Sequence, residues 1–210
     1  MTSDDLPVES VTPESGDPTA MLRELTDPKT LRALTHPVRL ALLEALALEG
    51  PLTATQAGEL IGESPTTCSF HFRQLAKYGF VEEAGAGPGR QRPWKISHTG
   101  MRFSDVTDDP EMSIAAQGLE RMVFDRAMSR FANFHEAKSS YSKEWQEAAQ
   151  NAETILWVTP EELQQVTTEV LTIFSRFYDR ISDPSLRAEG SLAVEVLLLS
   201  YPVKLTRSIS

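Results

Sequence analysis

Residues 53–78 read TATQAGELIGESPTTCSFHFRQLAKY and contain two short helical patterns that meet at a tight break. Apolar residues recur at three- and four-residue spacing through residues 57–61, as on one face of a helix. Gly62 can take the left-handed conformation that ends a helix, and Ser64 followed by Pro65 is typical of the start of the next one. The stretch therefore predicts a helix-turn-helix.

The second of these helices has two different faces. Cys68, Phe72 and Leu75 follow one another at four- and three-residue spacing, so we expect them in the core and expect no thiol chemistry from Cys68. The opposite face is polar, and no acidic residue lies between Ser64 and Tyr78. Because hydroxyl, guanidinium and carboxamide groups bind base edges and phosphates, this face is predicted to enter the major groove of DNA. The predicted DNA contacts of this helix are Ser64, Thr66, Thr67, Ser69, Phe70, His71, Arg73, Gln74 and Lys77.

Residues 80–96 read FVEEAGAGPGRQRPWKI and predict two strands joined by a glycine-rich turn. Arg90 and Arg92 lie toward the tip of this hairpin, and Lys95 follows just beyond. A basic loop of this kind can reach a neighbouring groove or its phosphates. Leu52 is expected to add a single residue to the same sheet. A helix-turn-helix followed by a basic hairpin predicts a winged helix.

Three segments resemble the ArsR type of winged-helix repressors: LTHPVRLALLEAL, SPTTCSFHFRQLAKYGFVEE and GPGRQRPWKIS. The resemblance covers residues 26–98 and implies a dimeric, sequence-specific DNA-binding regulator of transcription, expected to be a repressor. Phe72 and Phe80 stand where leucine is commoner in that family. For His71 we favour a packing or phosphate-contacting role over base reading. The positions that match the family pattern are His36, Pro37, Arg39, Ser69, His71, Leu75, Gly79, Val81 and Arg90.

Metal-sensing members of the resembled family carry a cysteine pair on the first helix of the helix-turn-helix, or histidine and carboxylate ligands on the dimer helix. Residues 56–63 hold no cysteine, and His135 beside Glu136 lacks a second histidine at suitable spacing. His36 is interpreted as a locally satisfied residue at a helix start. The sequence also lacks a phosphate-binding glycine loop and a nucleophile elbow. We therefore expect no metal, no cofactor and no enzymatic activity.

The chain has 210 residues, a net charge of −10 and one cysteine. A single cysteine without a secretory signal predicts a cytoplasmic protein, and no apolar run is long enough for a membrane helix. Residues 1–20 are acidic and rich in Pro, Ser and Thr, which predicts a disordered tail. A winged-helix domain is expected at residues 21–104. The polar segment DVTDDP at residues 105–110 is the predicted boundary to a second region, residues 105–210.

The second region predicts a long helix over residues 111–150, broken near Ser139 and Ser140, followed by a strand, a helix over 160–181 and another strand. The two predicted strands, 153–159 and 192–203, can pair parallel or antiparallel. The fold class is thus mainly α, or α+β. The long helix is the predicted dimer contact, through Leu119, Met122, Val123, Phe124, Ala127, Met128, Phe131, Phe134 and Trp145. The aromatic and methionine side chains of this region can form a plain core, which we favour, or a pocket for a small apolar effector. The candidate residues of such a pocket are Phe124, Met128, Phe131, Trp157, Phe174, Phe177 and Tyr178.

Two functions from different classes follow from these patterns. The favoured one is a homodimeric regulator that binds double-stranded DNA, because residues 64–78 and 85–95 together contain five basic residues and no acid. The alternative is a winged helix that binds another protein and reads no DNA sequence.

Overall fold

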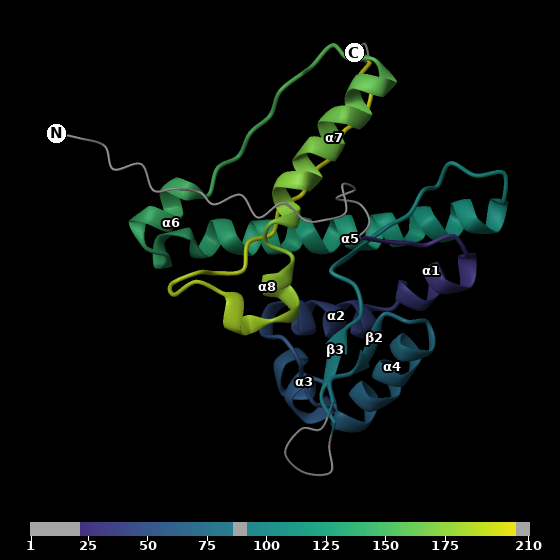
Figure 1. Ribbon diagram of the computed structural model, residues 1–210, viewed down its shortest axis with the longest axis vertical. Coiled ribbons are helices and arrows are strands. Elements are labelled where there is room, and N and C mark those ends of the chain that lie inside the picture. Colours follow the sequence, from purple (N-terminus) through teal and green to yellow (C-terminus); the bar gives the residue numbers. More distant parts are fainter. Residues whose placement is uncertain (1–21, 86–91, 205–210) are drawn as a thin grey trace, which may run out of the picture.

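The computed structural model describes residues 22–85 and 92–204 of the chain (Figure 1). The predicted acidic tail and Arg90 lie outside these residues. The first half contains β1 (Leu22–Glu24), α1 (Pro28–Leu34), α2 (Pro37–Glu49), α3 (Ala54–Ile61), α4 (Pro65–Lys77), β2 (Val81–Glu83), β3 (Trp94–Ile96) and β4 (Gly100–Arg102). The second half contains α5 (Pro110–Ala137), a 3₁₀ turn (Lys138–Ser140), α6 (Lys143–Ala148), α7 (Pro160–Ser175), α8 (Asp179–Ser182) and a 3₁₀ turn (Pro184–Leu186).

The helix-turn-helix is formed by α3 and α4, with Gly62 and Ser64 at the helix ends as predicted and a further cap at the start of α3. The Thr53 side chain accepts a hydrogen bond from the Gln56 backbone N–H, and the Gln56 side chain accepts one from Thr53 in return. Gly62 ends α3 with φ of 75°, in the left-handed region. Ser64 caps α4 through the backbone N–H of Thr67, and Pro65 occupies its first turn.

Two small sheets flank these helices. The antiparallel wing pair β2–β3 joins Val81 to Ile96, and Leu52 adds the predicted single bridge, to Trp94. A second, parallel pair, β1–β4, was not predicted: Leu22 lies opposite Gly100. A Cβ on Gly100 would come within 2.6 Å of a terminal methyl group of Leu22, so a larger residue there would require the Leu22 side chain to shift.

The core of the winged-helix domain continues past the predicted boundary at residue 104. Met112, Ala115, Ala116 and Leu119 belong to the same buried cluster as the residues of α1 to α4. Leu119 and Ala127 are buried within the single chain, so their prediction as dimer contacts is wrong. The first half of α5 is covered by α1, whereas Phe124, Met128 and Phe131 remain exposed.

The region after α5 departs most from the prediction. The break after Ala137 and the helix starting at Pro160 are confirmed, with Thr159 and Glu162 forming a capping box. Residues 153–159 and 192–203 are not strands, and no strand occurs among the described residues from 103 to 204. A strand requires a hydrogen-bonded neighbour, and neither segment has one among residues 22–85 and 92–204. None of the described residues from 128 to 204 is buried.

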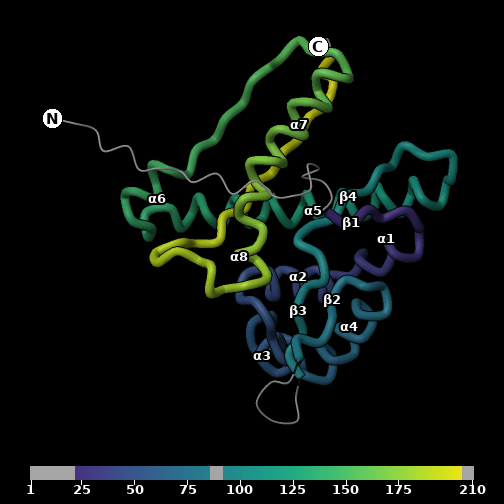
Figure 2. Tube along the Cα trace, viewed as in Figure 1, coloured from purple at the N-terminus to yellow at the C-terminus, as the bar shows by residue number. Residues whose placement is uncertain are grey.

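The long helix α5 lies between the helix-turn-helix and α7. The helices α2, α3 and α4 lie on one side of it, and α7 rises from the other (Figure 2). The surface of α4 that is predicted to bind DNA is therefore remote from α7.

Candidate nucleic-acid interface

The outward face of α4 forms one continuous stripe along the helix. After Pro65, the exposed residues of α4 are Thr66, Phe70, Arg73 and Lys77. They follow one another at four-, three- and four-residue spacing, which places them above one another on a helix surface. Thr67, Ser69 and Gln74 flank the stripe and are half-buried. The structure thus brings together most of the predicted contacts of the recognition helix.

The polar groups of this stripe have local partners. Arg73 donates a hydrogen bond from Nη2 to the Ser69 hydroxyl, at 2.9 Å. The ammonium of Lys77 lies 5.6 Å from the centre of the Tyr78 ring. The Ser64 and Thr67 hydroxyl oxygens are 2.8 Å apart at the helix start. These exposed contacts are worth little in water, so a DNA phosphate or base edge can replace them.

His71 lies on a different face from the stripe. It is only 8 % exposed, and its ring packs against that of His36 with centroids 4.5 Å apart. Its Nδ1 atom has no hydrogen-bond partner among the described residues. Burial first, and then the charges of His36 and Arg39, lower the pKa of His71 below its ordinary value. Of the two roles favoured for His71, this position corresponds to packing, and we no longer count it among the DNA contacts.

His36 itself begins α2 as predicted. Its Nδ1 accepts a hydrogen bond from the backbone N–H of Val38, at 3.2 Å, which caps the helix. Cys68 is fully buried beside Phe72, and burial raises the pKa of its thiol. Cys68 therefore serves the core, close to Gly58 of α3, and His36 serves the start of α2 and the packing of His71.

The wing brings acidic residues next to its basic ones. The strand pairing sets Glu82 opposite Lys95, and their carboxylate and ammonium groups are 3.0 Å apart. Arg92 donates to Glu83 at 2.6 Å, and this hydrogen bond is the main reason why the pKa of Arg92 is raised. The surface that is free of acids in the linear sequence is therefore not free of them in space. Arg90 lies outside the described residues.

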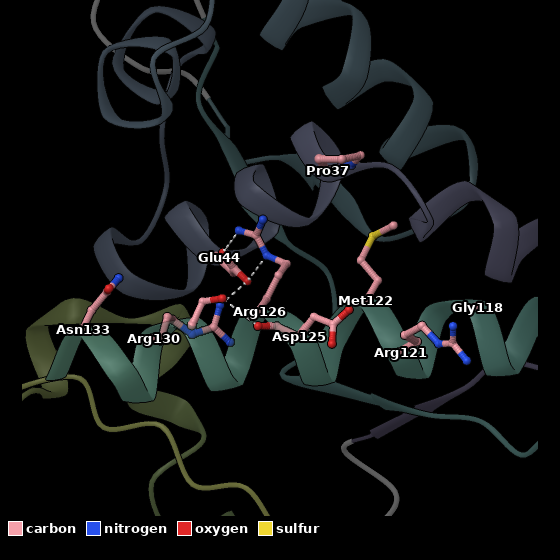
Figure 3. Close-up of a pocket in the computed structure, with 10 residues that line it drawn as sticks. Pro37, Glu44, Gly118, Arg121, Met122, Asp125, Arg126, Arg130 and Asn133 are labelled. Carbon is pink, nitrogen blue, oxygen red and sulfur yellow. Dashed lines mark hydrogen bonds and ion pairs between the residues drawn. The ribbon is translucent and has the colours of Figure 1, made fainter. Parts of the chain in front are cut away.

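A second charged cluster joins α2 to α5, across a hollow of about 550 Å³ (Figure 3). Arg126 donates hydrogen bonds to both carboxylate oxygens of Glu44, and Arg130 donates one to the same carboxylate at 2.5 Å. Arg130 also binds Glu195, at 3.0 Å from its Nε. Burial works against the charge of Glu44, but the hydrogen bonds and charges of the two arginines outweigh it and lower the pKa of Glu44.

This cluster was missed in the sequence. Its signal is faint: one acid, Glu44, in the middle of a mostly apolar helix, and two arginines four residues apart on α5. Which of the many acids would face those arginines depends on how α5 crosses α2. The cluster links the DNA-binding half of the chain to the long helix.

The predicted apolar effector pocket is not assembled in this chain. Of its seven proposed residues, Phe124 lines a hollow of about 430 Å³ together with Phe103, Leu197 and Leu199. Trp157 is 98 % exposed. Among the described residues, no group of three or more His, Cys, Asp or Glu side chains is placed to hold a metal ion. No helix in the described part of the chain combines the length and apolarity needed to span a membrane.

The arrangement of α3, α4 and the β2–β3 wing defines the class of protein, a winged helix-turn-helix. Residues 34–84 match the family model of a helix-turn-helix domain. The helix-turn-helix predicted from the sequence is thereby confirmed for this segment. This class is that of DNA-binding transcriptional regulators and points to a protein that is not an enzyme.

The match covers about a quarter of the chain, and the region from α5 onward lies outside it. A comparison with curated proteins gave no match. Among solved structures, the chain is similar to the homodimeric winged helix-turn-helix DNA-binding domain of Mb0332 from Mycobacterium bovis, a possible ArsR-family transcriptional regulator. The identity is 20 %, the TM-score is 0.30, and the alignment covers 51 % of this chain and 78 % of the other. A similarity this distant carries no functional argument.

Proposed function

We propose that this protein is a sequence-specific DNA-binding repressor that acts as a homodimer in the cytoplasm. The observation that supports this most is the exposed stripe of α4, which presents a hydroxyl, a guanidinium and an ammonium group along one line. Recognition helices of helix-turn-helix proteins read base edges from such a face in the major groove. Arg73 and Gln74 are the proposed base contacts, with Thr66, Thr67, Ser69 and Lys77 on bases or phosphates.

The proposed homodimer rests on the second half of α5. Phe124, Met128 and Phe131 are exposed at four- and three-residue spacing, so they form an apolar stripe on one side of the helix. Contiguous apolar surface of this kind usually marks an interface. A dimer would hold two recognition helices at a fixed separation, as a two-fold symmetric operator requires. Repression would follow from occlusion of a promoter.

The paired charges of the wing favour a second candidate function. With Glu82 and Glu83 bound to Lys95 and Arg92, the described part of the wing offers little positive charge to phosphates. A winged helix without sequence-specific DNA binding, used to bind another protein, fits this feature. The acid-free stripe of α4 supports the DNA-binding function instead.

A binding selection distinguishes the two candidates. The full chain is incubated with a pool of random duplex DNA, and the bound fraction is amplified and sequenced. A gel-shift with the DNA upstream of the protein's own gene provides the second measurement. A repressor dimer enriches a two-fold symmetric site with half-sites about one helical turn apart. A pool that stays random after several rounds contradicts sequence-specific binding and favours the protein-interaction module.

A small apolar effector remains part of the proposal, at the hollow that contains Phe124, Leu197 and Leu199. This hollow is lined by the exposed face of α5, so a bound molecule would alter the proposed dimer contact. Operator affinity measured with and without a panel of apolar metabolites tests it.

A further inference from the structure

Phe70 occupies the middle of the exposed stripe of α4. Its side chain is 54 % exposed, and its neighbours on the stripe are the hydroxyl of Thr66 and the guanidinium of Arg73. The ring takes no part in the buried core, whose contribution from α4 comes from Cys68, Phe72 and Leu75. A large apolar group outside the buried core therefore stands where DNA contacts are proposed.

The ring of Phe70 packs against the buried ring of His71 on one side. It contacts the His71 ring edge-on, with centroids 5.2 Å apart and an interplanar angle of 76°. His71 is itself buried and packed against His36. Phe70 is thus supported on one side by a fixed aromatic layer and offers its other side to whatever α4 meets. A supported ring loses little conformational freedom on binding.

The chemistry of Phe70 limits what it can recognise. A phenyl ring neither donates nor accepts a conventional hydrogen bond, so it cannot read the polar edges of the bases or hold a phosphate. In the major groove, the apolar group that distinguishes one base from the others is the C5-methyl of thymine. Phenylalanine is among the side chains that contact this methyl.

We infer that Phe70 determines specificity by packing against the C5-methyl group of a thymine in each half-site. This inference rests on the proposed binding of DNA by α4. Phe70 excludes water from the methyl group and penalises cytosine or a purine at that position. Arg73, one turn further along, supplies the hydrogen bonds to a neighbouring base.

Deoxyuridine scanning tests the inference, because uracil has the hydrogen-bonding groups of thymine and lacks only the methyl. An operator is first selected from random duplex DNA with the full chain. Each thymine is then replaced in turn by deoxyuridine, symmetrically in both half-sites, and the Kd is measured by fluorescence anisotropy. One position is expected to weaken binding by about fourfold per half-site, the equivalent of one buried methyl group.

The variant Phe70→Ala connects this loss to the residue. It is expected to bind the thymine and deoxyuridine operators with equal Kd, while circular dichroism shows an unchanged fold because Phe70 is outside the core. The matched control is Leu60→Ala, an apolar residue of α3 that is as exposed as Phe70, which must keep the fourfold loss per half-site.

The outcomes separate this inference from the proposed function. An enriched operator in which no deoxyuridine weakens binding overturns the role of Phe70 and leaves DNA recognition standing. The same holds if Phe70→Ala keeps the full methyl dependence. A selection that enriches no sequence overturns both.

Discussion

The carboxylate of Glu83 lies 2.6 Å from the guanidinium of Arg92, across the wing hairpin. One residue earlier on β2, Glu82 makes the same kind of pair with Lys95, at 3.0 Å. Both pairs are exposed, so each is weak and can open when a phosphate approaches. In the described part of the wing, Arg92 and Lys95 must therefore each leave a carboxylate before they bind DNA.

Removal of one wing acid is expected to strengthen DNA binding. In Glu83→Gln, Arg92 loses its anionic partner and becomes available to a phosphate. The slope of log affinity against log salt should steepen by about 0.9 for one added phosphate contact. Fluorescence anisotropy with an arbitrary duplex at several salt concentrations measures the slope. Glu120→Gln, an exposed acid on α5, is the control; equal slopes for the two variants would place the wing away from DNA.

Loss of the guanidinium on the recognition stripe should reduce specific binding. Arg73→Ala is expected to cost about 1 to 3 kcal/mol with a selected operator and much less with unrelated DNA. The reason is that Arg73 is proposed to read a base edge, whereas Lys77 is proposed to hold a phosphate. Arg176→Ala changes an exposed arginine beyond α7 and should leave the Kd unchanged. Equal losses on all DNA sequences would reassign Arg73 to the phosphates.

The parts of the fold that depend on residues close in sequence could be predicted from the sequence. Ser64, Gly62 and Thr159 act at helix ends through residues three or four positions away, so their roles can be read locally. The pairing of Leu22 with Gly100 could not be predicted, because a three-residue strand carries almost no pattern and its partner lies far along the chain.

The same distinction applies to the site. The outward stripe of α4 follows from helical spacing alone, and the structure agrees with it apart from His71. The wing charges were misjudged because Glu82 and Glu83 precede the turn in the sequence but face Lys95 and Arg92 once the hairpin closes. The segment 192–203 has the composition of a strand, yet a strand forms only where another edge is present.

The buried His71 should make the protein sensitive to acid. Because burial and nearby charges lower its pKa when folded, the unfolded chain takes up a proton near its ordinary pKa of 6.5, before the folded protein does. The stability that this residue contributes is complete above pH 6.5 and is lost as the pH falls through the folded pKa. Chemical denaturation of wild type and His71→Gln between pH 5 and 8 should show a smaller loss in the variant. His98→Gln, an exposed histidine, should behave as wild type; a variant curve parallel to wild type would exclude His71 as the source.

The ion cluster between α2 and α5 should stabilise the folded chain above acidic pH. Glu44→Gln leaves Arg126 and Arg130 without their carboxylate and is expected to cost about 1 to 2 kcal/mol at pH 7, between surface and buried pairs. Since the pKa of Glu44 is lowered from 4.5, this contribution is present above pH 4.5 and is lost as the pH falls through the folded pKa. Denaturant unfolding at pH 7 and pH 3.5 measures it. Glu111→Gln breaks an exposed pair with Arg32 and should change stability by less than about 0.5 kcal/mol; a similar loss in both variants would deny the cluster a special role.

The exposed stripe of α5 and the unpaired segments after it should be covered by a second copy of the chain. Phe131→Glu places a charge in the middle of the proposed contact and is expected to raise the dimer dissociation constant at least about tenfold, or 1.4 kcal/mol. Sedimentation equilibrium of the full chain measures this dissociation constant. The control is Val106→Glu, at a loop position that is 88 % exposed.

If the partner also supplies the missing strand edge, the backbone amides of 192–203 will exchange slowly with solvent in the wild-type dimer and fast in the Phe131→Glu monomer. Fast exchange in a stable dimer would restrict the interface to α5, and a wild-type protein that sediments as a monomer would remove the dimer from the proposal.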